Sequence, residues 1–229
     1  MQSPTQYHKI QTVFKRDPET KHKGLIIGDY SIPEFEYLKD NLWEFTEKVD
    51  GTNVRVTWDG HKVRFAGKTD NAQLNMQLVD MLIDQFTDDD MHKKFPDATE
   101  DEPVILYGEG VGGKIKKGAG NYVNCPESCF CNGTAFILFD VLIGPWQLRR
   151  GSDTEIAEGF NIREVPIIGT GTLIDMVNIV RVGVPSVFGD FQAEGIVARP
   201  YGTELFTRSG HRIITKVKCR DFYHERCGV

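Results

Sequence analysis

The chain has 229 residues, of which 40% are hydrophobic and 26% are charged, and its net charge is -6 at pH 7. This composition is that of an ordinary globular protein with room for a sizeable core, and the net charge argues against a surface that is basic throughout. The N-terminus lacks an apolar signal region, and the most apolar run, "AFILFDVLIGPW", contains Asp140 and is too short to span a bilayer. We therefore expect a cytoplasmic protein with no membrane partner.

The first strongly patterned segments are "WEFTEKV", "NVRVTW" and "KVRFAG", which are rich in β-branched and aromatic residues. Asp-Gly pairs at 50–51 and 59–60 separate them, so the pattern predicts an antiparallel meander with two tight turns. On the simplest interpretation, Lys48 is a solvated charge beside the first turn. The alternative is that the turn holds its amine for covalent catalysis.

Helical and strand patterns alternate through the rest of the chain. Apolar residues at helical spacing predict a helix over 72–86, and the apolar runs 103–110 and 135–143 predict buried strands. A helix over 152–160 would begin at Ser152, and one over 172–183 would end at Gly183. Two last strands are expected at 193–200 and 211–222. With no linker or repeat, the pattern predicts one α+β domain of antiparallel sheets flanked by helices.

The loop between the two buried strands has two notable features. It contains the glycine-rich segment "GGKIKKGAG", which could bind phosphate or RNA backbone or could be a plain surface loop. It also contains Cys125, Cys129 and Cys131, which could bind zinc, although a fourth ligand at a typical spacing is missing. Reduced thiols in a surface loop are the default expectation.

Charged residues recur at the expected strand ends, next to glycines or aromatic residues. In chain order they are Lys48 in "KVDG", Glu109 in "LYGEG", Asp140 after Phe139 in "FILFD", Glu194 in "AEGIV", and Lys216 with Lys218 in "TKVKC". Each alone has an ordinary explanation, because strand-end carboxylates are usually solvated and alternating lysines often protect an edge strand. Their joint occurrence in this order favours a functional site.

With these motifs, the chain from about Trp43 to Phe222 resembles the ATP-dependent RNA ligases, within the superfamily of covalent nucleotidyltransferases. The resemblance implies their nucleotidyltransferase fold, similar to ATP-grasp, and a reaction in which Lys48 forms a lysyl-AMP intermediate with ATP. It implies that Glu194 is a ligand for Mg²⁺ or Mn²⁺. It also implies a set of nucleotide-binding residues: Glu47, Lys48, Asn53, Lys68, Glu109, Phe139, Glu194, Lys216 and Lys218.

Physical chemistry is consistent with these roles. A lysine side chain is normally a protonated ammonium, so Lys48 would need cationic neighbours or a metal to release its proton before attack. Lys216 and Lys218 would supply positive charge there and also stabilise the phosphates, so we count both with Lys48 as catalytic. Glu109 would accept bonds from ribose hydroxyls and Phe139 would stack on adenine.

Three assignments are less direct. Asn53 could order a metal-bound water or simply cap the turn. Lys68 stands where the family usually has an arginine, so it retains the positive charge but lacks the bidentate hydrogen bonding of a guanidinium. The chain ends soon after Lys218, so we expect no C-terminal OB domain, a single domain over 1–229 with residues 1–40 as an N-terminal extension, and a protein partner that could supply a missing module.

The function that follows is the joining of RNA 5′-phosphate and 3′-hydroxyl ends, with a nicked duplex as one candidate substrate. The alternatives are a minimal DNA ligase or guanylyltransferase of the same superfamily, and a catalytically silent nucleotide- or RNA-binding protein. An intact set of Lys48, Glu109, Glu194, Lys216 and Lys218 disfavours the silent protein, because a binding protein needs no nucleophile.

Overall fold

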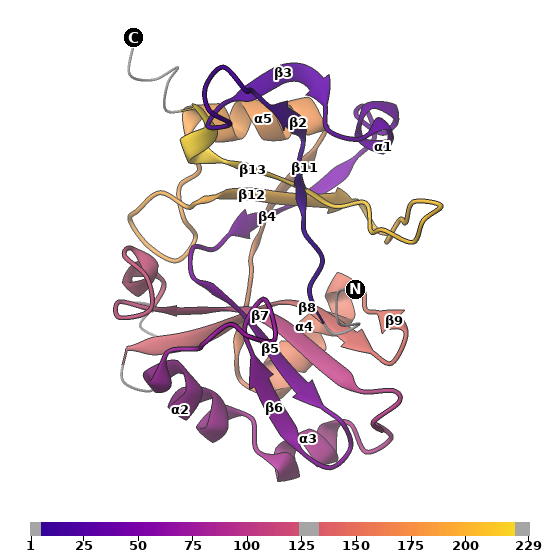
Figure 1. The fold of residues 1–229 in the computed structure, drawn as a ribbon, viewed down its shortest axis with the longest axis vertical. Coiled ribbons are helices and arrows are strands. Elements are labelled where there is room, and N and C mark those ends of the chain that lie inside the picture. The colour runs from indigo at the N-terminus through magenta and orange to yellow at the C-terminus, as the bar shows by residue number, and fades with distance from the viewer. Residues whose placement is uncertain (1–5, 124–132, 223–229) are drawn as a thin grey trace. The chain divides into compact units, whose positions relative to one another are not determined.

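The computed structural model describes residues 6–123 and 133–222. It confirms the expected mixture of helices and largely antiparallel sheets. Among the described residues, the chain divides into two compact units: unit 1 comprises 6–8 and 50–165, and unit 2 comprises 9–49 and 166–222 (Figure 1). The single nucleotidyltransferase domain stays a prediction.

Unit 1 is built on a six-stranded sheet with the order β10-β8-β7-β5-β6, and β9 is paired to β8. Its strands are β5 (Thr52–Trp58), β6 (Val63–Ala66), β7 (Val104–Gly112), β8 (Thr134–Ile143), β9 (Trp146–Gln147) and β10 (Arg163–Glu164). Its helices are α2 (Met76–Gln85), α3 (Asp88–Lys94), α4 (Arg150–Gly159) and the 3-10 helix η1 (Ala119–Tyr122). Helix α2 lies against the sheet, so Leu78 and Leu82 join Val54, Leu106 and Leu138 in one buried core (Figure 1).

Unit 2 contains a five-stranded sheet with the order β1-β13-β12-β4-β11 and a two-stranded sheet, β2-β3. Its strands are β1 (Gln11–Thr12), β2 (Phe14–Arg16), β3 (Leu25–Tyr30), β4 (Trp43–Lys48), β11 (Ile167–Gly171), β12 (Gly195–Pro200) and β13 (Thr215–Lys218). Its helices are α1 (Pro33–Tyr37), α5 (Leu173–Val182) and the 3-10 helix η2 (Cys219–Phe222). The core lies between α5 and one face of the larger sheet, where Met176 and Val180 pack with Phe45, Ile196 and Val217.

The expected N-terminal extension supplies structure to both units. Residues 6–8 belong to unit 1, whereas β1, β2, β3 and α1 belong to unit 2. Strand β1 pairs in parallel with β13, and Thr12 lies opposite Lys216. The first forty residues therefore contribute a strand next to the one that carries Lys216 and Lys218.

The predicted hairpin at Asp50–Gly51 is wrong. Strand β4 lies between β12 and β11, and β5 lies between β7 and β6, so the two strands belong to different sheets. The reason is that both edges of β4 are occupied by the distant strands β11 and β12, whereas β5 pairs with β7 and with β6, the strand that follows it. Strands β4 and β5 also pack their apolar side chains into different cores. The second predicted turn is confirmed, since β5 and β6 pair across Asp59–Gly60 with Trp58 opposite Val63.

The predicted helices are present, with two errors at their starts: α2 begins at Met76, four residues later than expected, and α4 begins earlier than expected. Helix α5 begins after Thr172, which forms a capping box with Asp175, and it ends at Gly183 as expected. Helix α4 begins at Arg150, so Ser152 lies inside its first turn and is not its N-cap. No helix within residues 6–123 or 133–222 has both the length and the apolar character needed to cross a bilayer.

Candidate active site

Three adjacent strands of unit 2 align the predicted catalytic lysines. Gly195 on β12 lies directly opposite Lys48 on β4 and, on its other side, directly opposite Lys218 on β13. Residues aligned across a sheet point to the same face, so Lys48 and Lys218 flank the glycine on one face. Lys216 points to this face too, because it lies two residues before Lys218 on the same strand.

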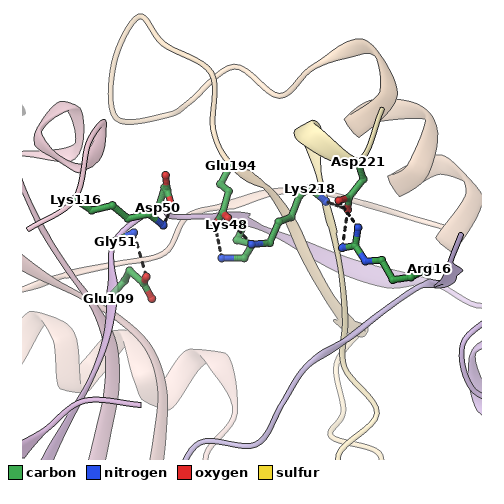
Figure 2. Close-up of polar contacts among 9 residues, drawn as sticks. All are labelled: Arg16, Lys48, Asp50, Gly51, Glu109, Lys116, Glu194, Lys218 and Asp221. Carbon is green, nitrogen blue, oxygen red and sulfur yellow. Dashed lines mark hydrogen bonds and ion pairs between the residues drawn. The ribbon is translucent and has the colours of Figure 1, made fainter. Parts of the chain in front are cut away.

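Glu194 connects the two flanking lysines (Figure 2). Its Oε2 accepts a hydrogen bond from the Lys48 Nζ at 2.5 Å, and its Oε1 accepts one from the Lys218 Nζ at 2.6 Å. All three side chains are largely buried, with exposed fractions of 18% for Lys48, 11% for Glu194 and 15% for Lys218. The sequence-predicted nucleophile, metal ligand and one phosphate-binding lysine are therefore in direct contact.

The electrostatics of this cluster are dominated by the carboxylate. Burial by itself raises the pKa of Glu194, but the charge of Lys48 and the hydrogen bonds from both lysines outweigh it and lower this pKa to about 2. The pKa of Lys218 is also lowered, chiefly by burial and against the attraction of Glu194. Glu194 is thus held as a carboxylate at neutral pH, next to two cationic side chains.

Gly195 is required by the close approach of β12 to β13. Its φ is 157°, and a Cβ atom there would lie 2.1 Å from the backbone oxygen of Val217 and 2.7 Å from the Cα of Lys218. The missing side chain therefore allows β13 to approach β12 closely.

Asp221 fixes the end of β13 and was not predicted from the sequence. Its Oδ2 accepts a hydrogen bond from the backbone amide of Lys218 at 3.0 Å, and its Oδ1 accepts one from the Arg16 Nη1 at 2.7 Å (Figure 2). The side chain of Asp221 is 1% exposed. Only its position three residues after Lys218 could have suggested this role.

Glu47 lies on the opposite face of β4 from Lys48 and is 1% exposed. Its two carboxylate oxygens accept hydrogen bonds from the Ser186 hydroxyl at 2.6 Å and the Val187 amide at 2.8 Å. Burial raises its pKa, although both hydrogen bonds oppose the shift. Through these contacts Glu47 holds the segment after α5, and its expected role in nucleotide binding stays a prediction.

A second group of predicted residues lies in unit 1. Glu109 and Asn53 are directly opposite each other on β7 and β5, and the Oε1 of Glu109 accepts a hydrogen bond from the Gly51 amide at 3.1 Å (Figure 2). The buried side-chain oxygen of Asn53 has no hydrogen-bond partner among the described residues. Asn53 and Glu109 thus place an amide and a carboxylate side by side on one face of the sheet.

Asp50 and Gly51 act as anchors in unit 1 instead of forming a hairpin. The Asp50 carboxylate forms an ion pair with Lys116, a lysine of the glycine-rich loop (Figure 2). A Cβ on Gly51 would lie 2.3 Å from the backbone oxygen of Gly110, so only glycine fits there. No local pattern around Lys116 indicated that it pairs with the Asp-Gly motif.

Lys68 is exposed in the loop that follows β6. Buried Arg55 holds this loop, because its Nε donates to the Gly67 backbone oxygen at 2.9 Å and its Nη2 pairs with Asp70 at 2.6 Å. The structure therefore fixes the loop on both sides of Lys68 and leaves its side chain exposed.

Phe139 lies at an irregularity in the pairing of β7 and β8. Tyr107 is opposite Asp140 and Gly108 is opposite Leu138, so Phe139 is the extra residue. A bulge of this kind re-aims a side chain and is common near active sites. Phe139 as a whole is half-buried.

Cys125, Cys129 and Cys131 lie outside the described residues, so the zinc alternative stays a prediction. Within residues 6–123 and 133–222, no group of three His, Cys, Asp or Glu side chains is arranged to hold a metal ion.

The sequence matches the RNA ligase family over residues 41–218, a span that contains every predicted site residue. The chain belongs to the RNA ligase family. No curated protein sequence matches this RNA ligase-family chain. The match confirms the family that the motifs indicated, from Lys48 to Lys218.

Solved structures of Naegleria gruberi RNA ligase have a similar fold. A lysine-to-alanine mutant with ATP and Mn is 15% identical, with a TM-score of 0.65, and the match covers 97% of this chain and 59% of that one. An apo aspartate-to-alanine mutant is 15% identical, with a TM-score of 0.61 and coverage of 100% and 62%. The same ligase with PPi is 16% identical, with a TM-score of 0.60 and coverage of 99% and 63%. The family member described here thus spans about three fifths of the length of those chains.

Proposed function

We propose that this RNA ligase-family chain is an ATP-dependent RNA ligase that works through a covalent lysyl-AMP intermediate. The observation that carries the proposal is the contact of the Lys48 Nζ with Glu194 at 2.5 Å, with Lys218 on the other oxygen of the same carboxylate. A buried amine beside a fixed carboxylate and a second cation is the environment that nucleotidyl transfer to lysine needs.

In the first step, the neutral amine of Lys48 attacks the α-phosphorus of ATP. A P–N bond forms, the bond to the bridging oxygen breaks, and pyrophosphate leaves with the electron pair. Lys218 and Lys216 stabilise the negative charge that develops on the phosphates. Lys48 gives one proton to solvent to become the neutral amine, and its nitrogen loses a second proton to solvent as the P–N bond forms. In the resting protein the Lys48 Nζ donates a hydrogen bond to Glu194.

Glu194 is the proposed ligand for Mg²⁺ or Mn²⁺. Its carboxylate has the hard oxygen donors that a divalent cation prefers, and its pKa of about 2 keeps it ionised at neutral pH. Metal binding would take the place of one of the lysine contacts that its oxygens make in the resting protein. When bound, the metal would supply further positive charge to the phosphates and to the departing pyrophosphate. The Naegleria gruberi structures with ATP and Mn and with AMP and Mn support this choice of cofactors.

The proposed roles in unit 1 follow the side chains that are available there. Glu109 accepts hydrogen bonds from ribose hydroxyls, Asn53 offers its buried side-chain oxygen to a polar group of the ligand, and Phe139 stacks on adenine. Exposed Lys68 contacts phosphate. These roles, together with the nucleotidyltransferase fold similar to ATP-grasp, belong to the proposal.

In the second step, an oxygen of the RNA 5′-phosphate attacks the phosphorus of lysyl-AMP and releases Lys48. In the third, the 3′-hydroxyl attacks the 5′-phosphorus, forms the phosphodiester and expels AMP. Each step moves a phosphorus between two nucleophiles, so the same cationic side chains serve all three. The proposed setting is RNA repair in the cytoplasm, with a nicked duplex as the first substrate to test and a protein partner as a candidate source of further RNA contacts.

The test is covalent labelling. The protein is incubated with Mg²⁺ and α-labelled ATP and is then denatured; we expect label on the wild type and none on Lys48→Ala. Lys62→Ala is the matched control, because Lys62 is also a lysine but lies exposed in unit 1. Label that persists in Lys48→Ala would refute the assignment of the nucleophile.

Two further arms separate the alternatives. Strong labelling by GTP without labelling by ATP would favour a guanylyltransferase, and joining of nicked DNA without joining of nicked RNA would favour a DNA ligase. A protein that binds ATP yet takes no label would be the catalytically silent binding protein. Chelation of Mg²⁺ by EDTA is expected to abolish labelling.

A further inference from the structure

Residues Gln6–His8 cover part of the functional face of unit 1. The ring of Tyr7 lies with its centroid 5.0 Å from the ring of Tyr107 and 5.0 Å from the ring of Phe139. Tyr107 and Glu109 point to the same face of the sheet because they are two residues apart on β7. Tyr7 therefore packs on the face that presents the proposed nucleotide-binding side chains of this unit.

Polar contacts hold this N-terminal segment in place. The hydroxyl of Tyr7 donates a hydrogen bond to Asp140, whose side chain is fully buried and also accepts one from the Gln147 Nε2 at 3.3 Å. The Gln6 Nε2 donates to Asp70 at 2.9 Å, and Asp70 is also paired with buried Arg55. Moving Tyr7 away would remove a donor from a buried carboxylate, which is costly. We therefore expect Tyr7 to stay in this position when a ligand binds.

The geometry of the two rings indicates how Tyr7 acts on Phe139. Tyr7 is 8% exposed and meets Phe139 at an interplanar angle of 72°. An edge-to-face neighbour fixes the orientation of a ring without stacking on it. Phe139 is half-buried, so this edge contact does not bury it completely.

We propose that Tyr7 is a positioning residue that holds Phe139 for stacking on the adenine of ATP. This inference rests on the proposed function, in which Phe139 binds the base. It assigns the N-terminal segment a part in recognising ATP.

The main test compares Tyr7→Ala and Tyr7→Leu, which remove the ring, with Tyr7→Phe, which retains it. In the labelling assay, the ring-deleted variants are expected to raise the KM for ATP about three- to tenfold, the range that one aromatic pair contributes. The rate at saturating ATP should stay within about twofold of wild type. Tyr7→Phe should have nearly the wild-type KM, since the ring remains.

A second readout distinguishes this role from general structural damage. Labelled protein, freed of ATP, is discharged by added pyrophosphate, and the half-maximal pyrophosphate concentration is measured. In this direction the adenine is already attached covalently, so the ring-deleted variants should require the same pyrophosphate concentration as wild type. Equal increases for ATP and pyrophosphate would overturn the proposal.

Tyr37→Ala is the matched control, because Tyr37 is a tyrosine of unit 2 that is 87% exposed. An unchanged KM for ATP in the ring-deleted variants would overturn the proposal, and a lowered KM would show that Tyr7 occupies the place of the base. If Tyr7→Ala does not fold, the KM for ATP of Tyr7→Leu, which fills most of the same volume, is the test of the proposal. Calorimetric Kd values for ATP test Tyr7 in the same way even if the wild type takes no covalent label, so failure of the proposed function is seen separately.

Discussion

Replacing Glu194 with glutamine removes the charge that Lys48 and Lys218 share while retaining the size of the side chain. The pKa of this carboxyl lies at about 2 in the folded protein, against an ordinary value of 4.5. A shift of this size corresponds to about 3 kcal/mol of folding free energy at neutral pH. We therefore expect Glu194→Gln to lower the free energy of unfolding by about 3 kcal/mol at pH 7.

The sign of the pH dependence follows from the direction of the shift. A carboxyl whose pKa is lowered by folding stabilises the protein fully above its unfolded pKa, and this contribution is lost as the pH falls from about 4.5 towards 2. The difference between wild type and Glu194→Gln should therefore shrink from about 3 kcal/mol at pH 7 to about 1 kcal/mol at pH 3.

The assay is urea-induced unfolding followed by circular dichroism at both pH values. Glu36→Gln is the control, since Glu36 is an exposed glutamate of α1 in the same unit. A difference that is the same at pH 3 and pH 7, or one below about 1 kcal/mol at pH 7, would refute the argument that the two lysines hold Glu194 ionised.

Three further predictions concern unit 2. Gly195→Ala should prevent stable folding, because its Cβ would lie 2.1 Å from a backbone oxygen of β13; a cooperative thermal transition like that of the wild type would contradict this. Asp221→Ala should slow labelling at saturating ATP about tenfold, because it frees the Lys218 amide; a rate within twofold of wild type in a folded variant would show that the contact does not position Lys218. Ser186→Ala should lower stability by about 1 kcal/mol through its bond to Glu47 and leave the KM for ATP unchanged; a raised KM would support the predicted role of Glu47 in nucleotide binding.

The elements that local pattern determines were predictable from the sequence. The helical spacing of Leu78 and Leu82 gave α2, and the Asp59–Gly60 pair gave the β5–β6 hairpin. The alternation of Lys216 and Lys218 placed both on one face of β13. In each case the neighbours that decide the structure lie within a few residues.

Long-range pairing could not be read in this way. Asp50–Gly51 has the composition of a hairpin turn, yet β4 pairs with strands from residues 167–171 and 195–200. Lys48, Glu194 and Lys218 were assigned to one site through a family resemblance, whereas the contact among them depends on the sheet order. The roles of Lys116 and Tyr7 were not predicted because their partners, Asp50 and Asp140, lie 66 or more residues away in the sequence. The role of Asp221 was not predicted because its partner is the backbone amide of Lys218, which carries no sequence signal.

The sheet order of unit 2 has a consequence for biosynthesis. Strand β4, which ends at Lys48, is made early, but its neighbour β12 and the next strand, β13, belong to the last part of the described chain. Unit 1, whose residues from 50 to 165 are continuous in sequence, can fold while these strands are still inside the ribosome. Lys48 meets Glu194 and Lys218 only after they emerge, so the sheet of unit 1 can be complete before the contact among Lys48, Glu194 and Lys218 forms.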